Sequence, residues 1–118
     1  MTTLAFVFNS LPHASAAGRE GLDALLATSA FTEDIKVFFV GDGVNQLRKG
    51  QDTDSILSRD YISAFKLMDL YDIEQVFVCE QSLERYRLTE EELLISAQVV
   101  SAPAIADELN QCHKVLTF

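Results

Sequence analysis

The sequence has few cysteines and few histidines, and both shortages exclude classes of site. Two cysteines, Cys79 and Cys112, are too few for a disulfide framework, and a reducing compartment would keep both as thiols. Two separated histidines, His13 and His113, and the lack of a Cys-x-x-Cys pair leave no recognisable set of metal ligands. We therefore expect neither a metal nor another cofactor.

Basic residues and long apolar runs are also scarce. Nine Lys and Arg against eighteen Asp and Glu give a net charge of −9, so direct binding to nucleic acid or to an anionic membrane is not expected. The longest apolar runs, such as residues 4–8 and 37–40, fall far short of the roughly 20 residues that span a bilayer. No basic residue precedes Ala14-Ser15-Ala16, which argues against an export signal. The expected location is the cytoplasm.

What is present fits a globular α/β protein. With 118 residues, 48% of them hydrophobic, the sequence predicts one domain over residues 1–118 with a buried core. Four short, nearly continuous apolar runs are typical of strands buried on both faces, and a weaker fifth lies between two helical patterns. The gaps have room for crossover helices, which parallel strands require. We expect a three-layer α/β/α fold with a mainly parallel five-stranded sheet, its strands at residues 4–8, 35–40, 76–79, 98–101 and 115–118.

The first predicted helix covers residues 16–30, with Ser15 as its N-cap. Gly18 shares one face of this helix with Leu22 and Leu25, and Gly21 lies beside them. Because glycine weakens a helix, close packing against the sheet is the favoured explanation for both glycines, and an anion-binding N-terminus is the lesser alternative.

A second predicted helix, over residues 59–71, carries more apolar surface than one sheet face requires. The surplus has two explanations. Loop residues, such as Val44 and Ile56, could pack on the helix, or the helix could form a subunit interface, where aromatic residues and methionine are enriched. The interface candidates are Tyr61, Phe65, Met68 and Tyr71.

Known ligand-binding motifs are missing. Gly41-Asp42-Gly43 follows the second strand but lacks the third glycine of a dinucleotide fingerprint, so it predicts a turn. Neither a phosphate-loop Gly-Lys-Ser/Thr motif nor a Gly-x-Ser-x-Gly motif occurs. Further along, residues 89–92 have the pattern of a capping box and predict another helix through Leu93.

Cys79 is the residue with the most chemical potential. It ends the third strand, at the edge of a parallel sheet where reactive side chains gather, and directly precedes a short helical segment. The charge of neighbouring Glu80 disfavours a thiolate, and a cysteine ending an apolar strand is commonly an inert small hydrophobe. Cys112 precedes a strand and so belongs to the opposite edge. His13, in the loop after the first strand, could exchange a proton near Cys79, although a solvated loop histidine is the simpler interpretation.

Several segments together resemble the DsrE/DsrF/DsrH family of sulfur-relay proteins, and the resemblance covers essentially the whole chain. Its most specific parts are residues 18–30 and Leu70-Tyr71-Asp72-Ile73-Glu74-Gln75. The other matching segments are Phe6-Val7-Phe8, Pro12-His13, Val37-Phe38-Phe39, Asp42-Gly43-Val44, Arg59-Asp60-Tyr61-Ile62, Phe65-Lys66-Leu67 and Val78-Cys79.

The resemblance implies a subunit of a cytoplasmic sulfurtransferase complex, a heterohexamer with TusB-like and TusD-like subunits. Such a complex takes persulfide sulfur from a TusA-like carrier and passes it to a TusE-like carrier for 2-thiolation of uridine at transfer RNA wobble positions. The family's sulfur-carrying cysteine belongs to the TusD-type subunit, and its position aligns with Val78 here. The resemblance therefore implies a docking subunit that is not catalytic alone. The alternatives are a persulfide carrier acting through Cys79 and a flavodoxin-like small-ligand binder.

Overall fold

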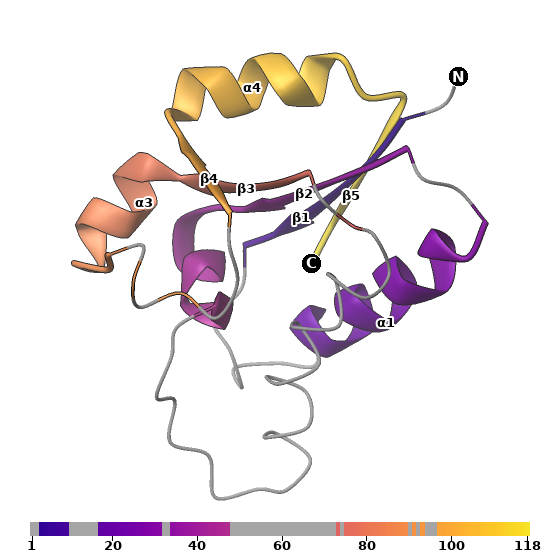
Figure 1. The fold of residues 1–118 in the computed structure, drawn as a ribbon, viewed down its shortest axis with the longest axis horizontal. Helices are drawn as coiled ribbons and strands as arrows, with labels where there is room; N and C mark the ends of the chain where they lie inside the picture. Colours follow the sequence, from indigo (N-terminus) through magenta and orange to yellow (C-terminus); the bar gives the residue numbers. More distant parts are fainter. Residues whose placement is uncertain are drawn as a thin grey trace, which may run out of the picture.

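A five-stranded, all-parallel sheet forms the centre of the molecule (Figure 1). The computed structural model describes residues 3–9, 17–31, 34–47, 73, 75–89, 91, 93 and 97–118. The strands lie within one or two residues of the predicted bounds, and the α/β prediction is confirmed. They are β1 (Leu4–Phe8), β2 (Ile35–Phe39), β3 (Val76–Cys79), β4 (Gln98–Val100) and β5 (Lys114–Thr117).

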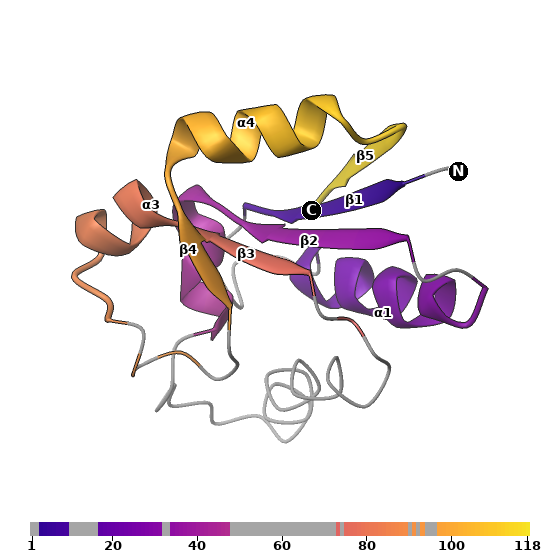
Figure 2. The same ribbon diagram turned by 45° about the horizontal axis from the view of Figure 1, so that its top comes forward.

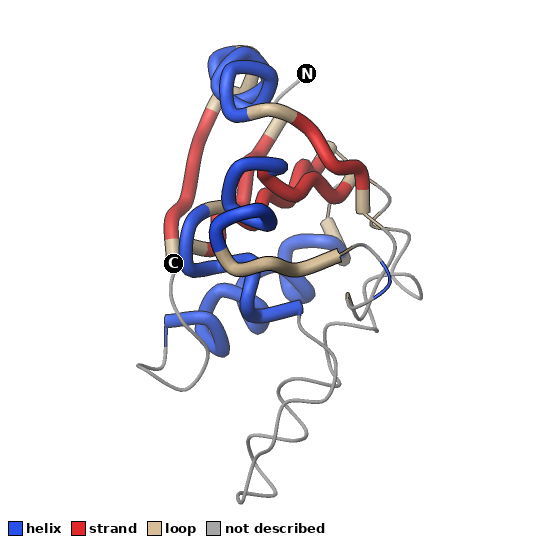
Figure 3. The backbone as a smooth tube through the Cα atoms, turned by 90° about the vertical axis from the view of Figure 1, so that its left-hand side faces the viewer, coloured by secondary structure: helices blue, strands red, loops and turns tan. Residues whose placement is uncertain are grey.

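Helices cover both faces of the sheet, which confirms the three layers. α1 (Ala17–Ser29) lies on one face and α4 (Ala102–Asn110) on the other (Figures 1, 2 and 3). Two shorter helices follow strands directly: the 3₁₀ helix η1 (Gly41–Leu47) after β2, and α3 (Glu80–Arg85) after β3. The predicted turn at Gly41-Asp42-Gly43 is thus the start of η1, and Gly41 has a φ of +53°.

The strand order is β4-β3-β2-β1-β5. The chain therefore adds β2, β3 and β4 in one direction and then returns across the whole sheet to place β5 beside β1. The returning segment contains α4, seen crossing above the strands in Figure 2. This single crossing explains why α4 lies on the face opposite α1.

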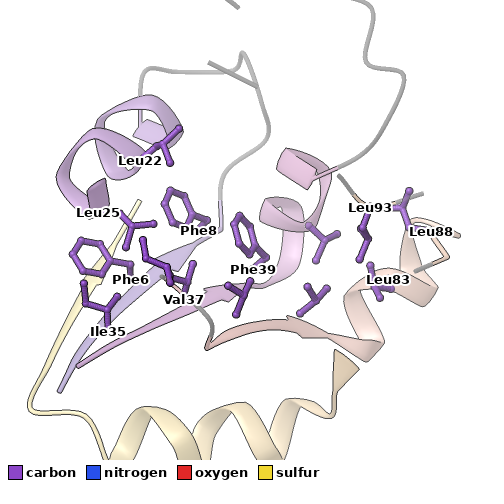
Figure 4. Close-up of a cluster of buried hydrophobic side chains, with 14 residues drawn as sticks. Phe6, Phe8, Leu22, Leu25, Ile35, Val37, Phe39, Leu83, Leu88 and Leu93 are labelled. Atoms are coloured by element: carbon purple, nitrogen blue, oxygen red, sulfur yellow. The ribbon is translucent and has the colours of Figure 1, made fainter. Parts of the chain in front are cut away.

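The larger core lies between the sheet and α1. Phe6 and Phe8 of β1 and Val37 of β2 lie beside Leu22 and Leu25 of α1, which are nearly inaccessible to solvent (Figure 4). Phe8 and Phe39 stack with their ring centroids 5.1 Å apart. Burial of these large side chains on neighbouring strands fixes the register of the sheet, because a one-residue slip would turn them to the other face.

The smaller core lies under α4. It contains Ala5, Val7, Phe38, Phe77 and Cys79 from the strands and Ile105 from the helix. Its side chains alternate along each strand with those of the larger core, as the two-residue period of a strand requires.

Two predictions need correction. Residues 115–118 were expected to be buried on both faces, but β5 is an edge strand in which Val115 is 44% exposed. The helix expected from the capping box does not continue through Leu93, which lies in an isolated β-bridge. Both patterns are local features of the sequence, whereas the strand order and the bridge depend on distant parts of the chain.

The first helix is closely packed at one of its two glycines. A Cβ atom placed on Gly21 would lie 2.5 Å from Cγ of Phe118 and 2.8 Å from Cε1 of Phe8, so close packing is confirmed at this position. The surroundings of Gly18 and the whole second helix at residues 59–71 lie outside the described residues. Within the described ranges, no helix is long and apolar enough to cross a membrane.

Candidate functional site at the carboxyl edge of the sheet

Cys79 is the last residue of β3 and occupies the N-cap position of α3, with φ −73° and ψ 120°. It pairs with Val100 of β4 in the parallel register. Its side chain makes no capping hydrogen bond to α3 and instead lies on the face that α4 covers. The strand therefore brings Cys79 to the predicted edge of the sheet but directs its sulfur into the core.

The thiol is enclosed and hydrogen-bonded. Cys79 is 6% exposed, and its Sγ donates to Oε1 of Gln81 at 3.7 Å. The same oxygen accepts a hydrogen bond from the backbone N–H of Ala102, at 3.0 Å. Gln81 thus joins the first turn of α3, the thiol and the first residue of α4.

The first turn of α4 has a second cap. Ser101, its N-cap residue, accepts a hydrogen bond from the N–H of Ala104 at 3.3 Å. Pro103, in the first turn, lacks an N–H and needs no partner there. The caps from Gln81 and Ser101 therefore satisfy two of the N–H groups that the first turn of a helix leaves unpaired.

A polar network fixes η1 to α3 on the same edge. Ser82, which is buried, accepts a hydrogen bond from the N–H of Gly41 at 2.8 Å. The hydroxyl of Tyr86 donates to the carboxylate of Asp42, and Nδ2 of Asn45 donates to the Asp42 carbonyl at 3.1 Å. Within the described residues, the loop after β2 and the helix after β3 consequently behave as one structural unit.

Gly43 determines how closely η1 approaches the sheet. A Cβ atom at this position would lie 1.8 Å from the carbonyl oxygen of Phe8, at the end of β1. The N–H of Val40 donates to that same oxygen at 3.1 Å. Main chain packs on main chain here, so only glycine fits without movement of the backbone.

Cys112 lies at the opposite edge, as expected, between α4 and β5. Its thiol donates to the carbonyl oxygen of Glu108 at 3.3 Å, one turn earlier in the helix. The Glu108 carboxylate forms an ion pair with the ammonium group of Lys36 at 2.6 Å. Burial raises the pKa of the Cys112 thiol above its ordinary value, Lys36 counteracts the rise, and Glu108 adds to it. These surroundings favour the neutral thiol.

The raised pKa gives a testable pH dependence. In a Cys79→Ser background, we expect the alkylation rate of Cys112 to rise with pH around a midpoint above that of a free cysteine. Glu108→Gln should lower the midpoint, and Lys36→Met should raise it further. Because the folded state binds the thiol proton more tightly, stability from this group should be lost as the pH rises through the folded pKa. Alkylation quenched at fixed times and measured by intact mass gives the midpoint. Equal midpoints in all three proteins would contradict the effects of Glu108 and Lys36 on the pKa of Cys112.

The remaining candidates divide into two groups. His113 lies within the described residues and binds Thr3, just before β1. Its ring Nδ1 accepts a hydrogen bond from the backbone N–H of Thr3 at 3.2 Å, and its backbone N–H donates to the Thr3 carbonyl at 2.9 Å. His13 and the four interface candidates Tyr61, Phe65, Met68 and Tyr71 lie outside the described residues. Among the described residues, no group of three or more His, Cys, Asp or Glu side chains is arranged to hold a metal ion.

The amino-acid sequence alone does not mark Gln81, Ser82 and Gly43 as organisers of this edge. Gln81 and Ser82 follow an apolar strand and have the ordinary composition of a short helix. The Gly41-x-Gly43 pair was a visible signal, but it indicates only a turn until the position of β1 is known.

Proteins of known family and fold share this architecture. The family model described as DsrE/DsrF-like matches residues 3–118. The chain is 51% identical over 118 residues to a Protein TusC homolog of Aliivibrio fischeri and 54% identical over 118 residues to one of Vibrio parahaemolyticus, with both chains fully covered in each case. The crystal structure of the ychN protein from Escherichia coli superposes with a TM-score of 0.84 over the full length of both chains at 19% identity, which shows the shared fold alone. This chain belongs to the DsrE/DsrF-like family.

Proposed function

We propose that this chain is a docking subunit of a sulfur-relay complex of the TusBCD type and that it does not carry the sulfur itself. The family and the full-length similarity to TusC proteins support a role in sulfur relay. In that role, residues 1–118 form one DsrE/F-like domain that completes an assembly with TusB-like and TusD-like subunits in the cytoplasm.

The placement of the two thiols is the observation that carries the proposal. Sulfur passes between proteins when a thiolate attacks a sulfur atom on its partner, so a relay thiol has to be accessible and readily ionised. Cys79 is 6% exposed and hydrogen-bonded, and Cys112 lies at the opposite edge with a raised pKa. The chain has no third cysteine. Neither thiol has the surroundings that such a transfer needs.

The proposed partners follow from the same role. The complex would receive persulfide sulfur from a TusA-like carrier and deliver it to a TusE-like carrier, for 2-thiolation of wobble uridine in transfer RNA. A net charge of −9 agrees with a subunit that meets other proteins and does not hold the RNA. The predicted interface residues Tyr61, Phe65, Met68 and Tyr71 remain the proposed contacts with the partner subunits.

One observation favours a second candidate function, a persulfide carrier acting through Cys79. Cys79 ends a central strand at the carboxyl edge, where ligands and reactive groups of open parallel sheets gather. A flavodoxin-like binder has less support. Ligands of such folds bind where the strand order reverses, which here is between β1 and β5. At this point the N–H of Asn9 already donates to the Phe118 carbonyl at 2.9 Å.

Substitution of the thiol separates the two functions. We expect cells carrying Cys79→Ser to keep thiolated wobble uridine near the normal level, while cells lacking the subunit lose it, because the docking role needs the fold and not the sulfur. Liquid chromatography of digested transfer RNA measures the modification, and Cys112→Ser serves as the matched control. Co-purification of the partner subunits establishes that each variant assembles. A Cys79→Ser variant that assembles normally but lacks the modification would make Cys79 a relay site.

A further inference from the structure

The side chain of Gln81 has an unusual position for an exposed residue next to a buried thiol. Its Oε1 atom accepts two hydrogen bonds, from the Cys79 thiol at 3.7 Å and from the N–H of Ala102 at 3.0 Å. The first donor ends β3, two residues before Gln81, and the second begins α4, 21 residues after Gln81. An exposed side chain thus connects the end of one strand to the start of a distant helix, directly at the sulfur.

The buried side chains that share the smaller core with Cys79 are apolar. Cys79 belongs to the core under α4 with Phe38, Phe77 and Ile105, all less than 10% exposed. These aromatic and aliphatic side chains offer the sulfur no hydrogen-bond acceptor. Within the described residues, Gln81 is the polar partner of the thiol, and it lies on the solvent side.

We infer that the Gln81 side chain shields the Cys79 thiol from solvent and from thiol-reactive compounds. Its oxygen accepts hydrogen bonds from the S–H and from the Ala102 N–H, so one side chain ties the thiol to the first residue of α4. The shield deepens the proposed function, since it gives a physical reason why a cysteine at the carboxyl edge takes no part in the relay. The shield is measured on the Cys79 thiol itself, so the measurement does not depend on sulfur transfer by the complex.

The rate at which Cys79 reacts with N-ethylmaleimide tests the shield. The full chain carrying Cys112→Ser has Cys79 as its one thiol, and intact mass reads this subunit by itself even in a co-purified complex. We expect Gln81→Ala to accelerate labelling of Cys79 by about fivefold or more at pH 7. Loss of one neutral hydrogen bond changes by about this factor the equilibrium constant for the local opening that exposes the thiol. Gln81→Glu keeps an acceptor oxygen at the same reach and should hold the rate at or below that of the parent.

Ser101→Ala is the matched control. It removes the other cap of α4, from Ser101 to the Ala104 N–H, without touching the thiol or its acceptor. An unchanged rate in this variant, with a faster rate in Gln81→Ala, supports the shield. Equal acceleration in both variants would mean that fraying of α4 controls access, and an unchanged rate in Gln81→Ala would mean that the core alone protects the thiol; either result overturns the role of Gln81.

The labelling rate and the level of thiolated uridine together separate the failure of the shield from the failure of the proposed function. If Gln81→Ala labels quickly while Cys79→Ser cells lose thiolated uridine, the shield is correct and the docking proposal is wrong. If labelling is unchanged while Cys79→Ser cells keep the modification, the docking proposal stands and the shield is wrong.

Discussion

Replacing Gly43 by alanine should lower the melting temperature of the protein by roughly 10 °C or more. The new Cβ atom would lie 1.8 Å from the Phe8 carbonyl oxygen and 2.9 Å from Cα of Asn9, so the main chain of η1 or of β1 has to move. Overpacking costs about 1–3 kcal/mol when side chains can adjust, and a backbone obstacle places this substitution at or above the upper end. The shift would also disturb the hydrogen bond from Val40 to Phe8.

Gly41 provides the control, since it lies two residues earlier in the same helix. Its φ of +53° disfavours an L side chain, but a Cβ atom there would meet nothing within 4 Å. Alanine at Gly41 should therefore cost only the left-handed backbone penalty, about 1–2 kcal/mol, and asparagine less. Urea and thermal unfolding of the full chain measure both variants. A smaller loss at Gly43 than at Gly41 would show that the approach of η1 to β1 is not as tight as the structure has it.

The second large effect is expected at Phe118. Its ring is nearly parallel to that of Phe6, with centroids 6.3 Å apart, and tilted against Phe8 at 5.8 Å. The ring also faces Gly21 of α1, where a Cβ atom would lie 2.5 Å from its Cγ. Phe118→Ala should cost about 2–4 kcal/mol of unfolding free energy, somewhat less than a fully buried phenylalanine, because the residue is only half-buried.

A double-mutant cycle tests whether the ring and the glycine are coupled. Gly21→Ala alone should destabilise the protein by about 1–3 kcal/mol, more than the roughly 1 kcal/mol that alanine adds to helix propensity. In the Phe118→Ala background its cost should fall by about 1 kcal/mol or more, since the nearest obstacle is gone. Phe8 would still lie close to the new atom, so some cost should remain. Additive losses in chemical denaturation would contradict the contact.

The central strands could be predicted from sequence because their residues are buried on both faces. β1 and β3 have the predicted bounds, and their apolar runs differ sharply from the flanking polar residues. The burial of β5 could not be predicted, since Val115 and Leu116 are as apolar as central residues. Only the return of the chain across the sheet makes β5 an edge strand. Likewise, Gly21 could be assigned to close packing, but the ring that requires it is contributed by residue 118.

For the candidate site, the sequence predicted the edge on which Cys79 lies and not the direction of its sulfur. The edge follows from the end of an apolar run in a parallel sheet. The direction depends on α4, whose Ile105 shares the smaller core with Cys79 and whose first residue, Ala102, bonds to Gln81; this helix begins more than twenty residues after Cys79. Gln81 has no distinctive pattern, because its two hydrogen bonds exist only when α3 and α4 have met.

The pairing of β1 with β5 has a consequence for how the chain is made. Thr3 and His113 bind each other across 110 residues, and Phe118 bonds to Val7 in the same ladder. A nascent chain can form β1, α1 and β2 while it is still attached to the ribosome, but β1 remains an open edge until residues 114–118 have left the exit tunnel. During that interval an apolar strand is available to other chains, since unpaired strand edges promote aggregation. Synthesis of this protein should therefore depend on what protects β1 until the last strand arrives.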